Sequence, residues 1–241
     1  MVIIISGCYN FTADVREGAS ASTEDPLSLT VYFLPSPDTA GGAVSVEEAL
    51  AGRRSRRDFT DKALSIEQLA QILWAAYGIT EPDAENPALR GGLRTAPSAG
   101  AMYPLEIYVA VGNVTRVETG LYKYEPIDDK IHKISKLINR DIRDELSEIA
   151  VNQAIIRDAP VSIIFSAVFD RTSERYGERG RERYVYMELG HSAQNVYLQA
   201  EALRLGTCAV GAFHDGRMSE LMRLPKDETP LYIMPVGYYV N

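Results

Sequence analysis

Apolar residues recur at helical spacing in the first regular part of the chain, between residues 45 and 78. Ser45–Glu48 has the sequence of a capping box, so a short helix is expected to start there and to end near Gly52. Ser65–Gln68 is a second capping box. The helix that follows it carries its apolar residues on one face and is expected to stop at Gly78.

Further along, the pattern becomes that of strands. Apolar and polar residues alternate over 105–111, which predicts a strand, and 161–169 is continuously apolar, as in a strand buried on both faces. A hairpin is predicted where Asp128-Asp129 separates two short apolar runs, and a last strand at 231–238. The segment 80–103 is predicted to be a loop, and a loop of that length in a compact domain is usually functional or disordered.

More helices are predicted between and after these strands. Asn139 is expected to cap a helix that carries Ile142 and Ile149, and a short helix is expected around 218–223. The longest helix should run from about Tyr184 to Leu205. It is apolar on most of its circumference, which predicts a central position. Because strands and helices mix without a strict βαβ rhythm, the chain is predicted to be α+β.

Composition divides the chain into an arm and one domain. Residues 1–44 are rich in small and polar residues and are predicted to form an extended N-terminal arm, with residues 45–241 as the folded domain. Ile5–Cys8 resembles the lipobox of bacterial-type lipoproteins, but its apolar run is far shorter than a signal-peptide core and no basic segment precedes it. Two interpretations stay open: an accidental match in a cytoplasmic protein, or a truncated start of a membrane-anchored lipoprotein held outside the cytoplasm through Cys8.

Charge and composition exclude several classes of function. The net charge of −8 disfavours nucleic acid as a partner. No apolar run is long enough to span a membrane, and two cysteines are too few for a disulfide framework or a structural zinc site. Glu188 and His191 have half of a di-iron pattern, but the second copy is missing, so no metal centre is expected. The chain also lacks the P-loop and dinucleotide-binding fingerprints.

Three segments carry candidate chemistry. Arg53–Arg57 holds four arginines and Ser55, a set of donors that suits a phosphate, although an isolated run of this kind is more often a solvated turn. Residues 95–106 read T-A-P-S-A-G-A-M-Y-P-L-E, in which small residues let main-chain amides come close to a ring. The third segment is E-L-G-H-S-A-Q-N at 188–195, followed by V-G-A-F at 210–213.

Together these segments resemble, in the same order, the motifs of the nitroreductase superfamily. The order P-S-A-G-x-x-Y-P-x-E is similar to that of its thiazole/oxazole-forming, or azoline oxidase-like, dehydrogenase branch. The resemblance covers residues 35–238. It implies a nitroreductase-like fold with a central, mostly antiparallel sheet flanked by helices, a homodimer, and FMN as the cofactor at the subunit interface.

The resemblance also implies which residues bind the FMN. The arginine segment should hold the phosphate and ribityl end and place one cation near N1 and O2 of the flavin. The P-S-A-G segment should reach the ring from the other subunit, a glutamine should lie under the site, and the V-G-A-F segment should offer a main-chain N–H to N5. In that order, these residues are Arg53, Arg54, Ser55 and Arg57, then Pro97, Ser98, Ala99 and Gly100, then Gln194, then Gly211 and Ala212.

The function implied is that of an FMN-dependent oxidoreductase that passes hydride from NAD(P)H to an unassigned small organic acceptor by a ping-pong mechanism. Tyr184 is the one candidate catalytic residue, as a proton donor. Azoline oxidases place a Lys-Tyr pair ahead of the central helix, whereas Arg183 stands at the lysine position here, which argues against azoline oxidation. Two alternatives remain: an azoline dehydrogenase subunit of a peptide-modifying complex, and a non-catalytic flavin-binding lipoprotein.

Overall fold

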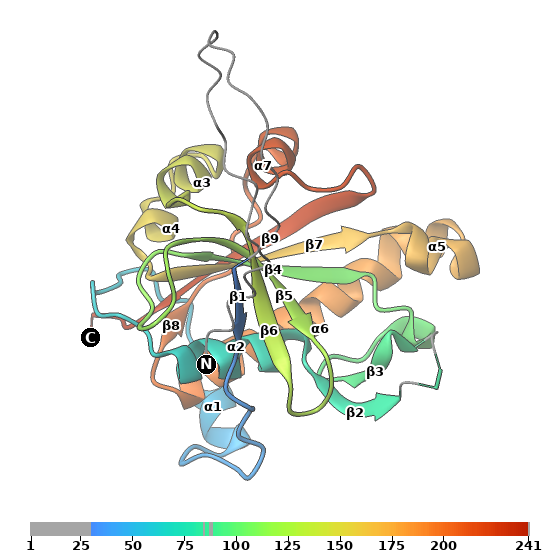
Figure 1. Cartoon of the computed structure of the whole chain (residues 1–241), viewed down its shortest axis with the longest axis horizontal. Coiled ribbons are helices and arrows are strands. Elements are labelled where there is room, and N and C mark those ends of the chain that lie inside the picture. The colour runs from blue at the N-terminus through green and yellow to red at the C-terminus, as the bar shows by residue number, and fades with distance from the viewer. Residues whose placement is uncertain (1–29, 84, 87–88, 241) are drawn as a thin grey trace, which may run out of the picture.

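The computed structural model describes residues 30–83, 85–86 and 89–240 (Figure 1). Cys8 and the lipobox-like sequence lie outside these residues. Among the described residues, no helix is long and apolar enough to cross a membrane. The elements are β1 Val31–Phe33, α1 Val46–Gly52, α2 Ile66–Tyr77, β2 Ile79–Asp83, β3 Gly91–Arg94, the 3₁₀ turn η2 Ala99–Ala101, β4 Leu105–Val111, β5 Gly120–Pro126, β6 His132–Ile138, α3 Arg143–Ile149, α4 Ala154–Asp158, β7 Val161–Val168, α5 Asp170–Tyr176, the π-helical turn η3 Gly180–Tyr184, α6 Val185–Ala202, β8 Gly206–Thr207, α7 Asp215–Met222 and β9 Glu228–Gly237.

A seven-stranded sheet forms the centre of the fold, with strand order β1-β6-β5-β4-β7-β9-β8. Every neighbouring pair in it is antiparallel, which confirms the predicted α+β class and antiparallel sheet. Alternate residues of β4 face opposite layers. Ile107 and Val109 pack in the core with α2 and α6, whereas Tyr108 and Ala110 pack with α3, α4 and α7 (Figure 1). Helices therefore bury both faces of the sheet.

The two predicted capping boxes are confirmed. Ser45 Oγ accepts from the N–H of Glu48 at 3.1 Å, and Glu48 Oε2 accepts from the N–H of Ser45 at 2.8 Å. Ser65 and Gln68 make the same reciprocal pair at the start of α2. These contacts satisfy main-chain donors that a helix start otherwise leaves unpaired, so both helices begin where the sequence predicts.

Three sequence expectations are wrong in detail. The segment 80–103 is not one loop, because β2 and β3 form an antiparallel hairpin within it. Asn139 does not cap α3: Asp141 Oδ1 accepts from the N–H of Arg143 at 3.0 Å, while Asn139 accepts from the Lys136 ammonium. The long helix α6 is confirmed, but one of its faces, which includes Tyr186 and Met187, is exposed.

The segment before Ser45 contributes to the sheet. Val31–Phe33 pairs with Lys133–Ser135 as the edge strand β1. The main-chain N–H of Leu34 donates to the carbonyl of His132 at 2.9 Å and extends the pairing. Residues 30–34 are therefore docked on the domain, and the chain from there leads to α1 (Figure 1).

Candidate functional site

The arginine turn after α1 lies against the segment that follows α6. Ser55 forms a parallel bridge with Thr207, and the N–H of Arg56 donates to the carbonyl of Thr207 at 3.0 Å. The two segments are about 150 residues apart in sequence. The fold thus brings the predicted arginine segment to the strand that leads into the predicted turn at Gly211 and Ala212.

Tyr197 of α6 holds this junction in place. Its hydroxyl lies 3.2 Å from Ser55 Oγ and accepts from the N–H of Ala209 at 2.8 Å. The Arg53 guanidinium lies over the Tyr197 ring, 5.2 Å from its centroid. A single rigid phenol from the long helix therefore fixes both segments relative to each other.

The four arginines have different environments. Arg56 is half-buried, pairs with Glu201 at 3.5 Å and stacks on Tyr239, 3.9 Å from the ring centroid, so it serves the fold. Arg54 is exposed and donates to the carbonyls of the last turn of α1. Arg57 is exposed and makes no hydrogen bond or ion pair with any other described residue. Within the described residues, the guanidinium groups of Arg57 and of Arg53 therefore keep all their donors for a ligand.

The turn at Gly211 and Ala212 offers main-chain donors. Val210 exchanges both main-chain hydrogen bonds with Ile233, at 2.8 and 3.0 Å, which anchors the start of the turn. The next two residues are exposed, and within the described residues their N–H groups have no partner. Gln153 donates to the carbonyl of Ala212 at 3.3 Å, and this hydrogen bond fixes the end of the turn.

Orphaned polar atoms mark the same junction. Arg56 Nε and Thr207 Oγ1 are buried and have no hydrogen-bond partner among the described residues. Buried polar atoms are nearly always paired in folded proteins, so an unpaired donor here points to a ligand or ordered water. The guanidinium groups and hydroxyls of this junction, with the free N–H groups of the turn at Gly211 and Ala212, fit the phosphate, ribityl and ring acceptors of a flavin nucleotide.

The Pro97–Gly100 segment lies elsewhere in the same chain. Asn195 Nδ2 donates to the carbonyl of Thr95 at 3.1 Å, and Ser98 Oγ accepts from the N–H of Tyr103 at 2.9 Å. Gly100 has a φ of 61°, and a Cβ there would lie 2.5 Å from the Tyr176 hydroxyl. These hydrogen bonds tie the segment to α6 and to its own turn rather than to the arginine turn.

The structure places the two remaining predicted residues on or next to α6. Gln194 is exposed on that helix. Tyr184 is half-exposed in the π-helical turn before it and packs edge-on against Tyr176, with ring centroids 5.2 Å apart. Among the described residues, no group of histidine, cysteine and carboxylate side chains could hold a metal ion.

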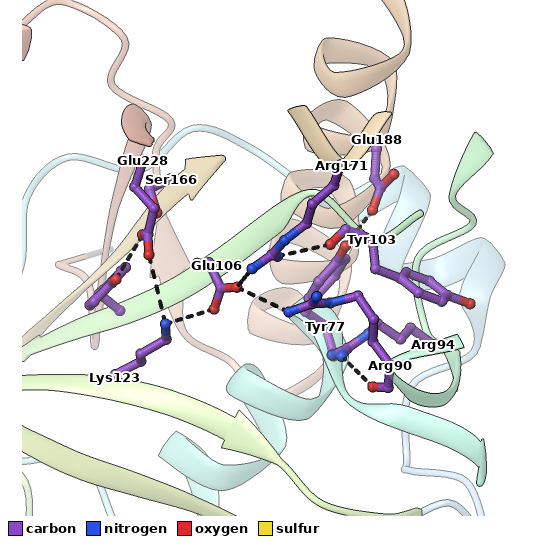
Figure 2. Close-up of polar contacts among 11 residues, drawn as sticks. Tyr77, Arg90, Arg94, Tyr103, Glu106, Lys123, Ser166, Arg171, Glu188 and Glu228 are labelled. Carbon is purple, nitrogen blue, oxygen red and sulfur yellow. Dashed lines mark hydrogen bonds and ion pairs between the residues drawn. The ribbon is translucent and has the colours of Figure 1, made fainter. Parts of the chain in front are cut away.

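A buried carboxyl group lies beside the Pro97–Gly100 segment, and the sequence did not predict its environment. Glu188 is 2% exposed and accepts from the Tyr77 hydroxyl (Figure 2). Burial raises the pKa of Glu188 to about 7, although hydrogen bonds from Ser98 and Tyr77 and the charge of Arg94 act in the opposite direction. Burial and the Glu188 charge together raise the pKa of Tyr77 well above its ordinary value. The sequence signal that could have revealed this environment is a glutamate among the mostly apolar residues that α6 buries.

The sequence of the chain is similar to those of known proteins. A model of the nitroreductase family matches residues 50–238. A nitroreductase-family protein of Methanocaldococcus jannaschii is 44% identical over 194 residues, which cover 80% of this chain and 91% of that protein. The microcin B17-processing protein McbC of Escherichia coli is 23% identical over 186 residues, covering 75% of this chain and 65% of McbC.

Solved structures agree with these matches. A nitroreductase-family structure from Ralstonia eutropha superposes with a TM-score of 0.72 at 28% identity. The superposition covers 88% of this chain and 90% of that one. The fold is therefore shared over almost the whole described chain.

Proposed function

The chain belongs to the nitroreductase family, and from that premise we propose that it is an FMN-dependent oxidoreductase that takes hydride from NAD(P)H and passes it to a small organic acceptor by a ping-pong mechanism. Bound FMN would supply the reversible two-electron chemistry. The observation that supports the proposal best is the junction itself, where Arg57 and the N–H groups of Gly211 and Ala212 are exposed and unpaired within the described residues.

Different residues of the junction would bind different parts of FMN. Arg53 and Arg54, with the Ser55 hydroxyl, would hold the phosphate and ribityl end, because planar guanidinium groups bind phosphate through two parallel hydrogen bonds. Arg57 would stabilise negative charge at the pyrimidine edge when the ring gains electrons. The main-chain donors at Gly211–Ala212 would orient the ring.

We propose a second copy of the chain as the partner that completes the site. Tyr186 and Met187 are 50% and 52% exposed on α6, an unusual degree of exposure for two large apolar residues on neighbouring positions of a long helix. Gly190, on the same face, would have no atom within 4 Å of an added Cβ. A second α6 can approach such a face closely. Pro97, Ser98, Ala99 and Gly100 would then cover the flavin of the other subunit, with Gln194 beneath it.

The acceptor is assigned only by class, as a small organic molecule. The azoline dehydrogenase alternative is supported by the P-S-A-G-x-x-Y-P-x-E order and by the similarity to McbC. It is opposed by Arg183, which stands where a lysine is expected. Tyr184 remains the proposed proton donor for either reaction.

One experiment tests the cofactor and the reaction together. Purified chain is incubated with FMN, desalted, and titrated anaerobically with NADH and with NADPH while the flavin absorbance is recorded. We expect a yellow protein that bleaches with one of the two and regains colour on addition of a quinone or nitroarene. A chain that retains no FMN contradicts the proposal. A yellow chain that neither nucleotide bleaches supports the non-catalytic alternative instead.

A further inference from the structure

A cavity lies between the β2–β3 hairpin, β4, β5 and α5, and no residue of the flavin junction lines it. It encloses about 360 Å³, within the range of small-molecule sites. Figure 2 shows its charged side chains converging on Glu106. The lining residues are Tyr77, Arg90, Arg94, Leu105, Glu106, Ile107, Lys123, Tyr124, Glu125, Pro126 and Arg171.

The wall of this cavity is cationic, in a chain whose net charge is −8. Arginines at 90, 94 and 171 and Lys123 face it, against the carboxylates of Glu106 and Glu125. Glu125 is already engaged outside the cavity, by the Lys133 ammonium at 3.5 Å and by the Ser135 hydroxyl. The cations therefore outnumber the carboxylates available to them.

Glu106 neutralises only part of this charge. It lies 3.0 Å from Lys123 Nζ and accepts from Arg171 Nη2. Burial opposes its ionisation, but the charges of Lys123 and Arg171 outweigh burial and lower the pKa of Glu106. Arg90 stands farther off, at 3.7 Å, and makes no hydrogen bond to Glu106. Lys123 also lies 3.8 Å from Glu228 Oε1. Lys123 and Arg171 are thus paired with carboxylates at hydrogen-bond distance, whereas Arg90 is not.

Arg94 carries a charge that no described carboxylate pairs with directly. Its guanidinium donates to two main-chain carbonyls, those of Tyr77 at 2.9 Å and Arg90 at 3.2 Å, and stacks on the rings of Tyr77 and Tyr103. Arg94 Nε is buried and has no partner among the described residues. Burial, with the nearby charges of Arg171 and Arg94, lowers the pKa of Arg90. Like charges are therefore held together here without enough counter-charge.

Aromatic and aliphatic side chains complete the cavity. Tyr77, Tyr124, Leu105 and Pro126 supply apolar wall beside the guanidinium groups. The Arg90 side chain is 42% exposed and the Glu106 side chain only 13%, so the Arg90 guanidinium lies toward solvent and the carboxylate lies deeper. A ligand entering from solvent would meet the positive groups first and then apolar surface.

We propose that this cavity binds a small organic oxyanion, a carboxylate or a phosphate ester, through the guanidinium groups of Arg90 and Arg94. Lys123 and Arg171, held by Glu106, are positioning groups that keep the local potential positive. A planar guanidinium accepts either kind of oxyanion in the same bidentate geometry, which is why the two share one site. This inference does not depend on the binding of FMN.

The test is calorimetric titration of the full chain, saturated with FMN where it binds, with succinate and with inorganic phosphate at constant ionic strength. We expect saturable binding of at least one probe with a Kd at or below about 1 mM. Arg90→Gln should weaken that binding by about tenfold or more, since a charge-assisted bidentate contact is lost. Arg157→Gln is the matched control, because Arg157 is an exposed arginine paired with Asp158 on α4. It should leave the affinity unchanged.

Preference for one probe assigns the ligand class, and either preference supports the proposal. Glu106→Gln serves as a second variant and should tighten binding, since it releases the cations that the carboxylate engages. Absence of saturable binding in the wild-type chain, or an unchanged affinity in Arg90→Gln, overturns the proposal. Binding seen only in Glu106→Gln would overturn it too, because the cluster would then serve to neutralise Glu106.

Discussion

The Tyr197 hydroxyl lies 3.2 Å from the Ser55 hydroxyl, a contact that joins residues 142 positions apart. The same oxygen accepts from the N–H of Ala209. The two halves of the proposed flavin junction are therefore positioned by one side chain of helix α6. Their relative position should depend on that oxygen more than on any contact between the two loops.

Tyr197→Phe tests this dependence. The substitution keeps the ring and removes the acceptor of the Ala209 N–H, so the free energy of unfolding should fall by about 1–2 kcal/mol. FMN affinity should fall as well, because the junction loses its fixed spacing. Urea denaturation and fluorescence titration with FMN measure the two effects. Tyr32→Phe, which removes the acceptor of the Glu118 N–H at the edge strand β1, is the control and should leave the FMN affinity unchanged. An unaltered FMN affinity in Tyr197→Phe would remove the positioning role.

Arg56 and Arg57 are neighbours with opposite expected phenotypes. Arg57→Gln should weaken FMN binding by about tenfold or more and leave stability unchanged, since Arg57 is exposed and has no partner in the described structure. Arg56→Gln should lower the free energy of unfolding by about 1 kcal/mol, because it loses a half-buried pair with Glu201 and a stacked ring. Both variants are measured by the same two titrations. If Arg56→Gln weakened FMN binding and Arg57→Gln lowered the free energy of unfolding, the roles proposed for the two arginines would be wrong.

Glu188 should make stability depend on pH with an unusual sign for a carboxyl group. Burial raises its pKa to about 7 in the folded chain, above its ordinary value of 4.5. Between these values the folded state binds the extra proton, so the stabilisation is complete below about pH 4.5 and is lost as the pH rises through about 7. The expected loss from this group is about 3 kcal/mol.

Glu188→Gln isolates that contribution. Glutamine can still accept from the Tyr77 hydroxyl but cannot ionise, so its free energy of unfolding, relative to wild type, should be higher at pH 8 than at pH 5. Urea denaturation at the two pH values gives the comparison. Glu182→Gln, at an exposed position of η3, is the control. A difference between wild type and Glu188→Gln that does not vary with pH would show that Glu188 is ionised throughout.

Local signals in the sequence were enough to predict much of the fold. The capping boxes at Ser45 and Ser65 act within one helical turn, and β7 is apolar at six of its eight positions, so neither depends on distant partners. The β2–β3 hairpin was missed because its strands are short and Gly91 and Gly92 resemble a loop. Asn139 and Asp141 are both good capping residues, and only the packing of α3 decides between them.

The candidate site was predictable only as a set of motifs. The sequence contains the arginines at 53–57 and the small residues at 211–212. The position of the arginine turn relative to Ala209, which precedes those small residues, depends on Tyr197, and no pattern in the sequence marks Tyr197. The role of Arg56 depends on Glu201 and Tyr239, which come from the far end of the chain. Glu188 was considered only as a metal ligand, because its burial against Tyr77 and Ser98 is a tertiary property.

Gly190 gives the sharpest test of the proposed homodimer. An arginine there has room in a single chain, since an added Cβ would meet no atom within 4 Å, but it would stand between two α6 helices that pack on this face. Gly190→Arg should therefore be a folded monomer by light scattering, with unchanged helical circular dichroism, and it should lose FMN because the loop of the other subunit is absent. Gly216→Arg, an equally open glycine in α7, should keep the oligomeric state and the cofactor of the wild type. If Gly190→Arg remained a dimer with full FMN occupancy, the partner would dock on a different face, and the Pro97–Gly100 segment would not be the part of the second subunit that completes the site.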